Sequence, residues 1–283
     1  MNEAAVTVVG ATSKLGQNLI LKLIAAGRRV IPLARRLDAL PMDQQATARY
    51  FDLEQPETLR TALADAAYVV SCVPAHNAAT VVAALPAQTR RIVMMGSTRI
   101  FTRYPNRHVE MQKQAVAALA HCGIPGVVLH PTMIYGGPTD ANVQRIAAYI
   151  RKFGIVPLPA GGLARLQPIN SDDVVACIEA SLMQDSALGE PLVVAGPEAI
   201  TYRDLVTAVG HAIGKTPVVV PLPGLLLQIA ALLTAVVPGV PTIRMSEIRR
   251  LSENKTFPID EMRRRLGVDP MPIAAGLART FAG

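Results

Sequence analysis

The sequence contains no tryptophan and few aromatic side chains of any kind. Aromatic residues make up 4% of its 283 residues and charged residues 17%, whereas 51% are hydrophobic. Proteins that bind single-stranded nucleic acid need aromatic platforms on which bases stack, and disordered chains have a low hydrophobic content. Both classes are therefore poor fits. The composition is typical of a globular protein whose hydrophobic core is large enough to stabilise the fold without disulfides or bound metals.

Cysteine is also scarce. Cys72, Cys122 and Cys177 are an odd-numbered and widely spaced set with no Cys-x-x-Cys pair. We therefore expect neither a disulfide framework nor a zinc site, and no other cluster of residues predicts a metal. The chain also opens without the positively charged segment of a secretory signal, so the cytoplasm is the expected compartment.

Charge of one sign is in moderate excess, but it is not concentrated. Lys and Arg number 28 against 21 Asp and Glu, which gives a formal net charge of +7. The basic residues form short doublets and one triplet instead of a dense tract, which is typical of solvated surfaces and helix ends. We predict a small-molecule substrate as the partner and no nucleic acid.

Long hydrophobic runs are absent apart from residues 222–237. A proline, a glycine and a glutamine interrupt this run, and it is shorter than the roughly 20 apolar residues that cross a bilayer. The run predicts a buried helix. A dimer face, or a membrane contact helped by the basic stretch 244–250, is the less favoured alternative. The chain is expected to be a monomer or a homodimer.

Short apolar strands alternate with amphipathic helices along the first half of the chain. The expected strands are 5–9, 30–33, 68–73, 91–95 and 126–129, and the helices between them are 15–26, 59–64, 77–85 and 109–121. Such alternation, with short joints, is typical of right-handed crossovers on a parallel sheet that is covered on both faces. The sequence predicts an α/β fold with a doubly wound parallel sheet, a Rossmann fold.

The second half is looser and rich in Pro and Gly. A helix at 172–183, a strand at 192–195 and a helix at 202–213 are its clearest elements. We predict a dinucleotide-binding core at residues 1–135, to whose sheet strands near 155 and 192–196 return. A smaller mixed substrate lobe at 136–283 follows, and it is not cleanly separable from the core.

The first joint between strand and helix is a glycine turn. Gly10 permits the tight turn and Gly16 lets the helix pack close to the sheet, while Ser13 stands where a third glycine is usual. The backbone N–H groups here lie at a positive helix end, where an anion binds. The turn therefore predicts a dinucleotide site formed by Gly10, Thr12, Ser13, Lys14, Leu15 and Gly16.

Two arginines follow the second expected strand. A site specific for NAD has an acidic residue there, which accepts hydrogen bonds from the ribose 2′-hydroxyl. Arg35 and Arg36 favour a 2′-phosphate instead, because guanidinium groups form forked, charge-assisted contacts to phosphate. We predict NADP as the cofactor, with NAD as the alternative.

Four segments together resemble the extended and atypical short-chain dehydrogenase/reductases, the NAD-dependent epimerase/dehydratase family. They are Gly10-Ala-Thr-Ser-Lys-Leu-Gly16, Asp52-Leu53, His130-Pro-Thr-Met-Ile-Tyr-Gly136 and Gln167-Pro-Ile-Asn-Ser-Asp-Asp-Val174. The stretch 156–169 is most similar to the atypical branch that includes the short-chain-dehydrogenase-like accessory subunit of respiratory complex I. The resemblance implies that further residues line the cofactor: Asp52 and Leu53 at the adenine, Cys72, Val73 and Pro74 at the nicotinamide ribose, and Pro131, Thr132 and Met133 along the nicotinamide.

Catalysis in this family uses a Ser or Thr, a Tyr that transfers a proton, and a Lys four residues after the Tyr. The resemblance places Ser97 and Lys113 in two of these roles, with Lys113 also holding the ribose, but Val109 stands four residues before Lys113. We therefore expect little turnover on simple sugars and alcohols. Tyr104, His76 and His108 are the candidates for a substitute donor.

The preferred function is an NADP(H)-binding oxidoreductase or epimerase-type enzyme. Its substrate would be a small carbonyl, an alcohol or a compound similar to a nucleotide sugar. The alternative is a non-catalytic, nucleotide-bound sensor or assembly factor, which the missing Tyr allows.

Overall fold

Two compact units, interleaved along the sequence, make up the chain. The computed structural model describes residues 4–104, 107–136, 140, 142–223 and 253–282. The first unit comprises Met1–Pro131, Ser171–Val194 and Ile259–Asp269, and the second comprises Thr132–Asn170, Ala195–Pro258 and Pro270–Gly283. The sequence places the division once, after residue 135, whereas the structure shows the chain returning twice to the first unit.

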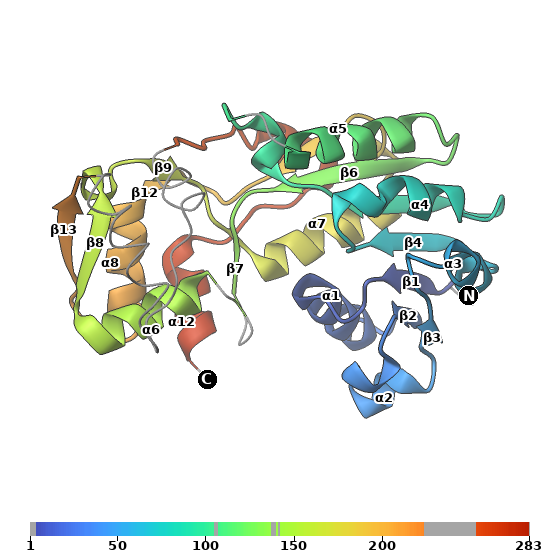
Figure 1. Cartoon of the computed structure of the whole chain (residues 1–283), viewed down its shortest axis with the longest axis horizontal. Coiled ribbons are helices and arrows are strands. Elements are labelled where there is room, and N and C mark those ends of the chain that lie inside the picture. Colours follow the sequence, from blue (N-terminus) through green and yellow to red (C-terminus); the bar gives the residue numbers. More distant parts are fainter. Residues whose placement is uncertain (1–3, 105–106, 137–139, 141, 224–252, 283) are drawn as a thin grey trace. The chain divides into compact units, whose positions relative to one another are not determined.

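The first unit is built on a parallel sheet (Figure 1). Its order is β11-β6-β5-β4-β1-β2-β3. The strands are β1 (Val6–Val9), β2 (Val30–Ala34), β3 (Arg49–Tyr50), β4 (Tyr68–Ser71), β5 (Arg91–Met95), β6 (Gly126–Pro131) and β11 (Leu192–Val194). This confirms the doubly wound α/β fold. The winding direction reverses between β1 and β4, and ligands of such sheets bind outside the carboxyl ends of the strands at that point.

Helices cover both faces of this sheet (Figure 1). α3 (Pro56–Leu63), α4 (Ala78–Ala83) and α5 (Arg107–Ala120) pack side chains such as Leu59, Val81 and Leu119 into one core with Val69 and Ile92 of the strands. α1 (Lys14–Ala25) and α7 (Ser171–Met183) pack together on the other face. Asn18 of α1 donates its Nδ2 proton to Asp172 Oδ1 across 3.2 Å.

The remaining elements of the first unit are short. They are η1 (Leu37–Ala39), α2 (Met42–Gln45), η2 (Ala75–Asn77), η3 (Thr98–Phe101), η5 (Asp185–Ala187) and α11 (Asp260–Leu266). Arg265 of α11 is buried, and its guanidinium donates to the carbonyls of Ala187 at 2.8 Å and Glu190 at 3.0 Å. These bonds tie the returning segment 259–269 to the loop before β11.

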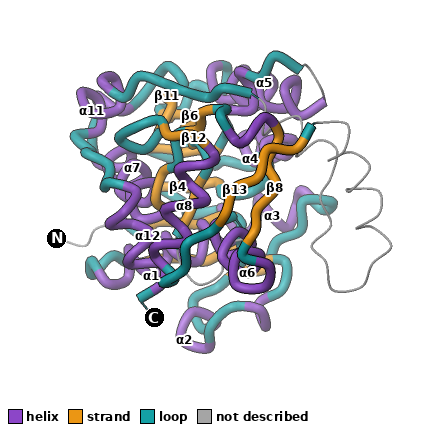
Figure 2. The backbone as a smooth tube through the Cα atoms, turned by 90° about the vertical axis from the view of Figure 1, so that its left-hand side faces the viewer, coloured by secondary structure: helices purple, strands orange, loops and turns teal. Residues whose placement is uncertain are grey.

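The described residues of the second unit form three small two-stranded sheets. They pair β8 (Ile155–Pro159) with β13 (Val218–Leu222), β7 (Ile134–Tyr135) with β10 (Ile169–Asn170), and β9 (Arg165–Leu166) with β12 (Ile200–Thr201). Figure 2 shows β8 and β13 side by side. The helices are α6 (Val143–Phe153), η4 (Ala160–Gly162), α8 (Tyr202–Ala212) and α12 (Ile273–Phe281), and the α-helices pack Ala147, Leu205 and Leu277 into a separate core.

One expected strand joins a different sheet from the one predicted. The strand near 155 is present as β8, but it does not return to the large sheet, because residues 218–222 form a parallel partner for it along its whole length. The strand expected near 192–196 is β11, which pairs with β6 at the edge of the large sheet. Most of the apolar run 222–237, and the basic stretch 244–250, lie outside the described residues. Among the described helices, none combines the length and the apolar character needed to span a membrane.

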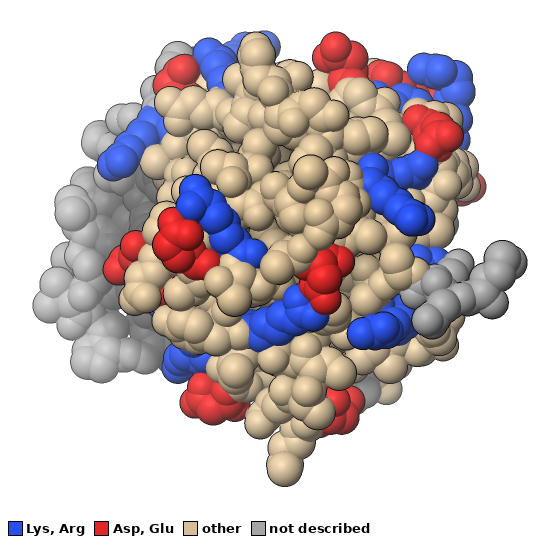
Figure 3. Space-filling view, turned by 90° about the vertical axis from the view of Figure 1, so that its right-hand side faces the viewer, with Lys and Arg blue, Asp and Glu red and all other residues tan. Residues whose placement is uncertain are grey.

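Basic side chains are dispersed on the face drawn in Figure 3. Lys and Arg lie there in small groups with Asp and Glu between them. Several Arg side chains of the first unit are paired with carboxylates: Arg49 contacts Asp65, Arg60 contacts Glu57, and Arg91 contacts Asp185. This distribution is that of a solvated surface, and the absence of a nucleic-acid partner stays a prediction.

Candidate functional site

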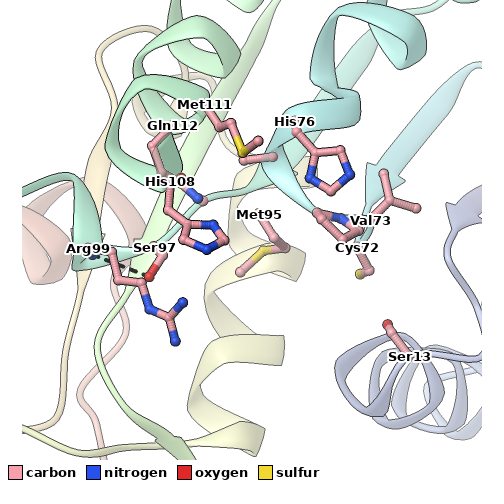
Figure 4. Close-up of a pocket in the computed structure, with 13 residues that line it drawn as sticks. Ser13, Cys72, Val73, His76, Met95, Ser97, Arg99, His108, Met111 and Gln112 are labelled. Carbon is pink, nitrogen blue, oxygen red and sulfur yellow. Dashed lines mark hydrogen bonds between the residues drawn. The ribbon is translucent and has the colours of Figure 1, made fainter. Parts of the chain in front are cut away.

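A cavity of about 610 Å³ opens at the carboxyl ends of β1, β4 and β5, within the first unit (Figure 4). The glycine turn contributes one side of it, the segment after β4 a second, the segment after β5 a third, and helix α5 the fourth. The lining residues are Ser13, Cys72, Val73, Pro74, Ala75, His76, Met95, Gly96, Ser97, Arg99, His108, Met111 and Gln112. No carboxylate is among these described lining residues.

Gly10 makes the turn after β1 possible. Its φ of +86° lies in the left-handed region, and a Cβ there would lie 3.0 Å from Val73 Cγ1 and 3.2 Å from the carbonyl carbon of Cys72. The N–H groups of Gly10 and Ala11 both donate to the carbonyl of Leu33, at 3.1 and 3.0 Å. The turn is therefore fastened to the end of β2, from which Arg35 and Arg36 follow directly.

The first turn of α1 offers backbone donors to an anion. Ser13 caps the helix, because its Oγ accepts the N–H of Gly16 at 3.0 Å. The leading N–H groups of a helix have no carbonyl one turn back, so they bond caps, water or ligands. Gly16 has no room for a Cβ, which would lie 2.5 Å from the carbonyl oxygen of Gly10. This tight turn with outward N–H groups fits the pyrophosphate of a dinucleotide.

The variant Ser13→Gly tests whether the Ser13 hydroxyl serves the helix or the cofactor. Glycine at this position opens the approach of the pyrophosphate to the backbone, so we expect NADP(H) affinity to be kept or improved. The free energy of unfolding should fall by only about a few tenths of a kcal/mol, as is usual when Gly replaces Ser at an N-cap. Calorimetric titration and urea unfolding measure the two effects. A loss of affinity of about tenfold or more would make Ser13 a phosphate ligand.

Ser97 lies directly after β5, at the cavity wall. It caps η3, because its Oγ accepts the N–H of Arg99 at 3.3 Å. This bond uses an oxygen lone pair and leaves the hydroxyl proton to be donated to a substrate oxygen. The predicted polarising residue and the cofactor residues Ser13, Cys72, Val73 and Pro74 thus line one cavity.

The buried ring of His130, on the neighbouring strand β6, fixes the backbone of Ser97. The ring is 1% exposed, and its Nδ1 accepts the N–H of Ser97 at 3.0 Å. Burial lowers the pKa of His130 to about 4, so the ring is neutral at pH 7 and carries its proton on Nε2. Nε2 has no hydrogen-bond partner among the described residues. His130 was predicted only as part of the motif 130–136, and its bond to Ser97 was not, because the two residues lie 33 positions apart in the sequence.

Gly96 makes the close approach of His130 possible. A Cβ at Gly96 would lie 2.4 Å from His130 Nδ1. Packing against His130, and not a left-handed backbone conformation, therefore excludes a side chain at position 96.

Helix α5 presents a different face to the cavity from the one the sequence suggested. His108, Met111 and Gln112 line it, at the i, i+3, i+4 spacing of one helix face (Figure 4). Val109 is buried, and Lys113 pairs through Nζ with Glu110 Oε1 at 3.1 Å, outside the lining. Gln112 thus lines the cavity and Lys113 does not, and the role predicted for Lys113 in the site stays a prediction.

Cys72 lines the cavity, but its thiol is not expected to act as a nucleophile. Burial raises its pKa to about 12, so it stays protonated at neutral pH. All three cysteines are unpaired.

Other predicted residues lie apart from the cavity lining. Arg35 and Arg36 are exposed at the end of β2. The carboxylate of Asp52 accepts the N–H of Glu54 at 3.0 Å, so it caps its own loop, and its role at the adenine stays a prediction, as does that of Leu53. Pro131 ends β6. Thr132 and Met133 belong to the second unit, and Tyr104 is exposed and outside the lining.

Comparisons with known proteins agree with this geometry. Residues 10–143 match the model of a family described as NAD(P)H-binding. A mitochondrial NADH dehydrogenase [ubiquinone] 1 alpha subcomplex subunit 9 of Arabidopsis thaliana is 24% identical over an alignment 242 residues long. The alignment covers 77% of this chain, and the chain spans 60% of that relative's length. The sequence match agrees with the resemblance to the atypical branch.

Solved structures share the fold. An NADPH-dependent quinone oxidoreductase of Escherichia coli, complexed with NADPH, superposes with a TM-score of 0.77 at 18% identity, covering 98% of this chain and 99% of that one. A UDP-glucose 4-epimerase of Thermus thermophilus, complexed with NAD, superposes with a TM-score of 0.73 at 17% identity, covering 98% of each chain. Their likeness confirms the predicted Rossmann architecture.

Proposed function

We propose that this chain is an NADP(H)-dependent oxidoreductase, since residues 10–143 match a family described as NAD(P)H-binding. It transfers a hydride between the nicotinamide and a small carbonyl or alcohol. The observation that carries the proposal is the shared cavity, which runs from Ser13 at the glycine turn to Ser97 after β5. The bound cofactor supplies the hydride.

The chain's own residues orient and polarise the substrate. The Ser97 hydroxyl donates to the carbonyl oxygen, where negative charge develops as the hydride arrives. His130 holds the peptide of Ser97 in place through a bond of 3.0 Å. The thioethers of Met95 and Met111 provide an adaptable apolar wall that suits an uncharged carbon skeleton.

NADP(H) is expected to bind at least about tenfold tighter than NAD(H), a difference of about 1.4 kcal/mol. Arg35 and Arg36 supply the reason, because they follow the strand end to which the glycine turn is hydrogen-bonded. Calorimetric titration of both cofactors, with Arg35→Ala and Arg36→Ala, measures the preference and assigns it. The exposed Arg60, which pairs with Glu57 on α3, gives the matched control Arg60→Ala. Equal affinities would contradict the NADP assignment.

Turnover is tested by the absorbance of NADPH at about 340 nm with a panel of aldehydes, ketones, quinones and nucleotide sugars. We expect oxidation of NADPH with at least one carbonyl compound. The alternative function is a non-catalytic, nucleotide-bound assembly factor, and the likeness to a protein named as an NADH dehydrogenase subunit favours it. NADPH binding without turnover on any compound would select that alternative.

The expected compartment and assembly also remain proposals. Unpaired Cys72, Cys122 and Cys177 are consistent with the reducing cytoplasm. A monomer or a homodimer is proposed, and light scattering distinguishes the two.

A further inference from the structure

Helix α5 places His108, a residue that can donate a proton, in the wall of the cavity that Ser97 also lines. His108 and Gln112 stand four residues apart on the cavity face. Val109, which occupies the position of the missing Tyr, and Lys113 do not line the cavity. Residues four apart on a helix are neighbours on one face. The geometry therefore provides an imidazole and, one turn on, an amide.

This pair of side chains is chemically consistent with acid/base work. A phenol needs a nearby ammonium to lower its pKa from about 10 toward neutrality. An imidazole side chain titrates near neutral pH without such help. A histidine donor therefore does not need the Lys ammonium that lowers the pKa of a Tyr donor, and the neutral amide of Gln112 can stand in its place. The amide N–H groups can still donate a hydrogen bond to a ribose hydroxyl.

Several ionisable groups lie near His108 in the chain: Arg107 adjoins it at the start of α5, and Arg103 and Tyr104 precede the helix. The ionisable groups that line the cavity with it are His76 after β4, Arg99 of η3 and Cys72, whose thiol stays protonated. On its own helix, Glu110 and Lys113 pair with each other outside the lining. His108 is exposed, so its imidazole can exchange protons with water between turnovers.

We propose that His108 is the proton donor and acceptor of this site and that Gln112 holds the cofactor ribose. The inference rests on the proposed function. In the reductive direction, a hydride joins the carbonyl carbon, the C=O π electrons move to oxygen, and that oxygen takes the Nε2 or Nδ1 proton of the His108 imidazolium. Ser97 donates a hydrogen bond to the same oxygen. The products are an alcohol, oxidised cofactor and neutral His108, which water reprotonates.

The first test compares turnover of the full chain with that of His108→Gln. We expect kcat to fall by at least about 100-fold, the usual contribution of general acid catalysis, with the Kd for NADPH changed less than about threefold. His121→Gln is the matched control, since His121 lies at the far end of α5 and contacts Ala117 O at 2.7 Å. Turnover of His108→Gln within about tenfold of wild type would overturn the inference and leave the proposed function standing.

The pH profile separates a proton donor from a structural residue. Wild-type turnover in the reductive direction should fall as the pH rises, because the donor must be protonated. The double variant His108→Tyr with Gln112→Lys rebuilds a phenol and an ammonium on the cavity face. We expect it to keep measurable turnover and to shift the fall to higher pH. An unchanged profile in the double variant would overturn the inference.

A readout without turnover tests which residues face the cofactor. NADPH at about ten times its Kd leaves about a tenth of the protein unliganded, so maleimide labelling of Gln112→Cys should slow about tenfold. Labelling of Lys113→Cys, followed by peptide mass spectrometry, should be unchanged. The reverse pattern would restore the assignment of Lys113 and overturn the inference. Wild-type NADPH binding with no turnover on any carbonyl would overturn the proposed function together with it.

Discussion

Replacing Gly10 by valine is expected to abolish NADP(H) binding, with a loss of affinity of at least about 100-fold. The φ of Gly10 is +86°, where a β-branched residue is strained, and its new Cβ would press on Val73 Cγ1 at 3.0 Å and on the backbone of Cys72 at 3.2 Å. The turn must open to relieve these contacts, and its N–H groups then leave the phosphate position. Calorimetric titration with NADPH measures the loss.

Gly27 provides the matched control for this variant. It also has a positive φ, +73°, but nothing lies within 4 Å of the position of its Cβ. Gly27→Val therefore carries the same kind of backbone strain without the contact, and we expect it to lower stability while leaving NADPH affinity within about threefold of wild type. Similar affinities of Gly10→Val and wild type would contradict the placement of the cofactor at this turn.

Acid is expected to destabilise the fold through His130. The folded pKa of this buried ring is about 4, below the ordinary value of 6.5, so the unfolded chain binds the proton more readily. The neutral ring contributes its stability fully above about pH 6.5 and loses it as the pH falls toward about 4, a change of about 3 kcal/mol.

Urea unfolding of wild type and His130→Gln at several pH values measures this contribution. The variant should be less stable near neutral pH, because the N–H of Ser97 loses its acceptor. The difference between the two proteins should shrink by about 3 kcal/mol between about pH 7 and pH 4. A difference that does not change with pH would show that His130 is not buried as a neutral ring.

Local patterns were sufficient to predict most of the large sheet and the glycine turn after β1. Apart from β3, which is only Arg49–Tyr50 and was not among the expected strands, the strands of the first unit are short apolar runs rich in β-branched residues, and the helix after Gly10 follows its strand within a few positions. Such signals lie within one stretch of chain, so the Rossmann fold, the role of Gly10 and the position of Ser97 after β5 could all be inferred from residue types and spacing.

Features that depend on distant residues or on helix rotation were not predictable. β8 pairs with β13 more than sixty residues later in the chain, and no local pattern specifies that partner. The bond between Ser97 and His130 is likewise set by the neighbouring strands β5 and β6. On α5, a difference of one residue rotates a side chain by about 100° around the helix axis, so the sequence alone could not show that Gln112 lines the cavity.

The most direct test of hydride transfer in this cavity follows the label from NADPH carrying deuterium at C4 of the nicotinamide. The purified full chain is incubated with this cofactor and with each carbonyl compound that consumes NADPH, and the products are analysed by mass spectrometry. Ser97→Ala serves as the matched variant, because it removes the polarising hydroxyl and leaves the backbone bond to His130 available. We predict an alcohol product one mass unit heavier with wild type, formed at least about 100-fold more slowly by Ser97→Ala. NADPH that binds tightly while its deuterium reaches no product would contradict an oxidoreductase at this site.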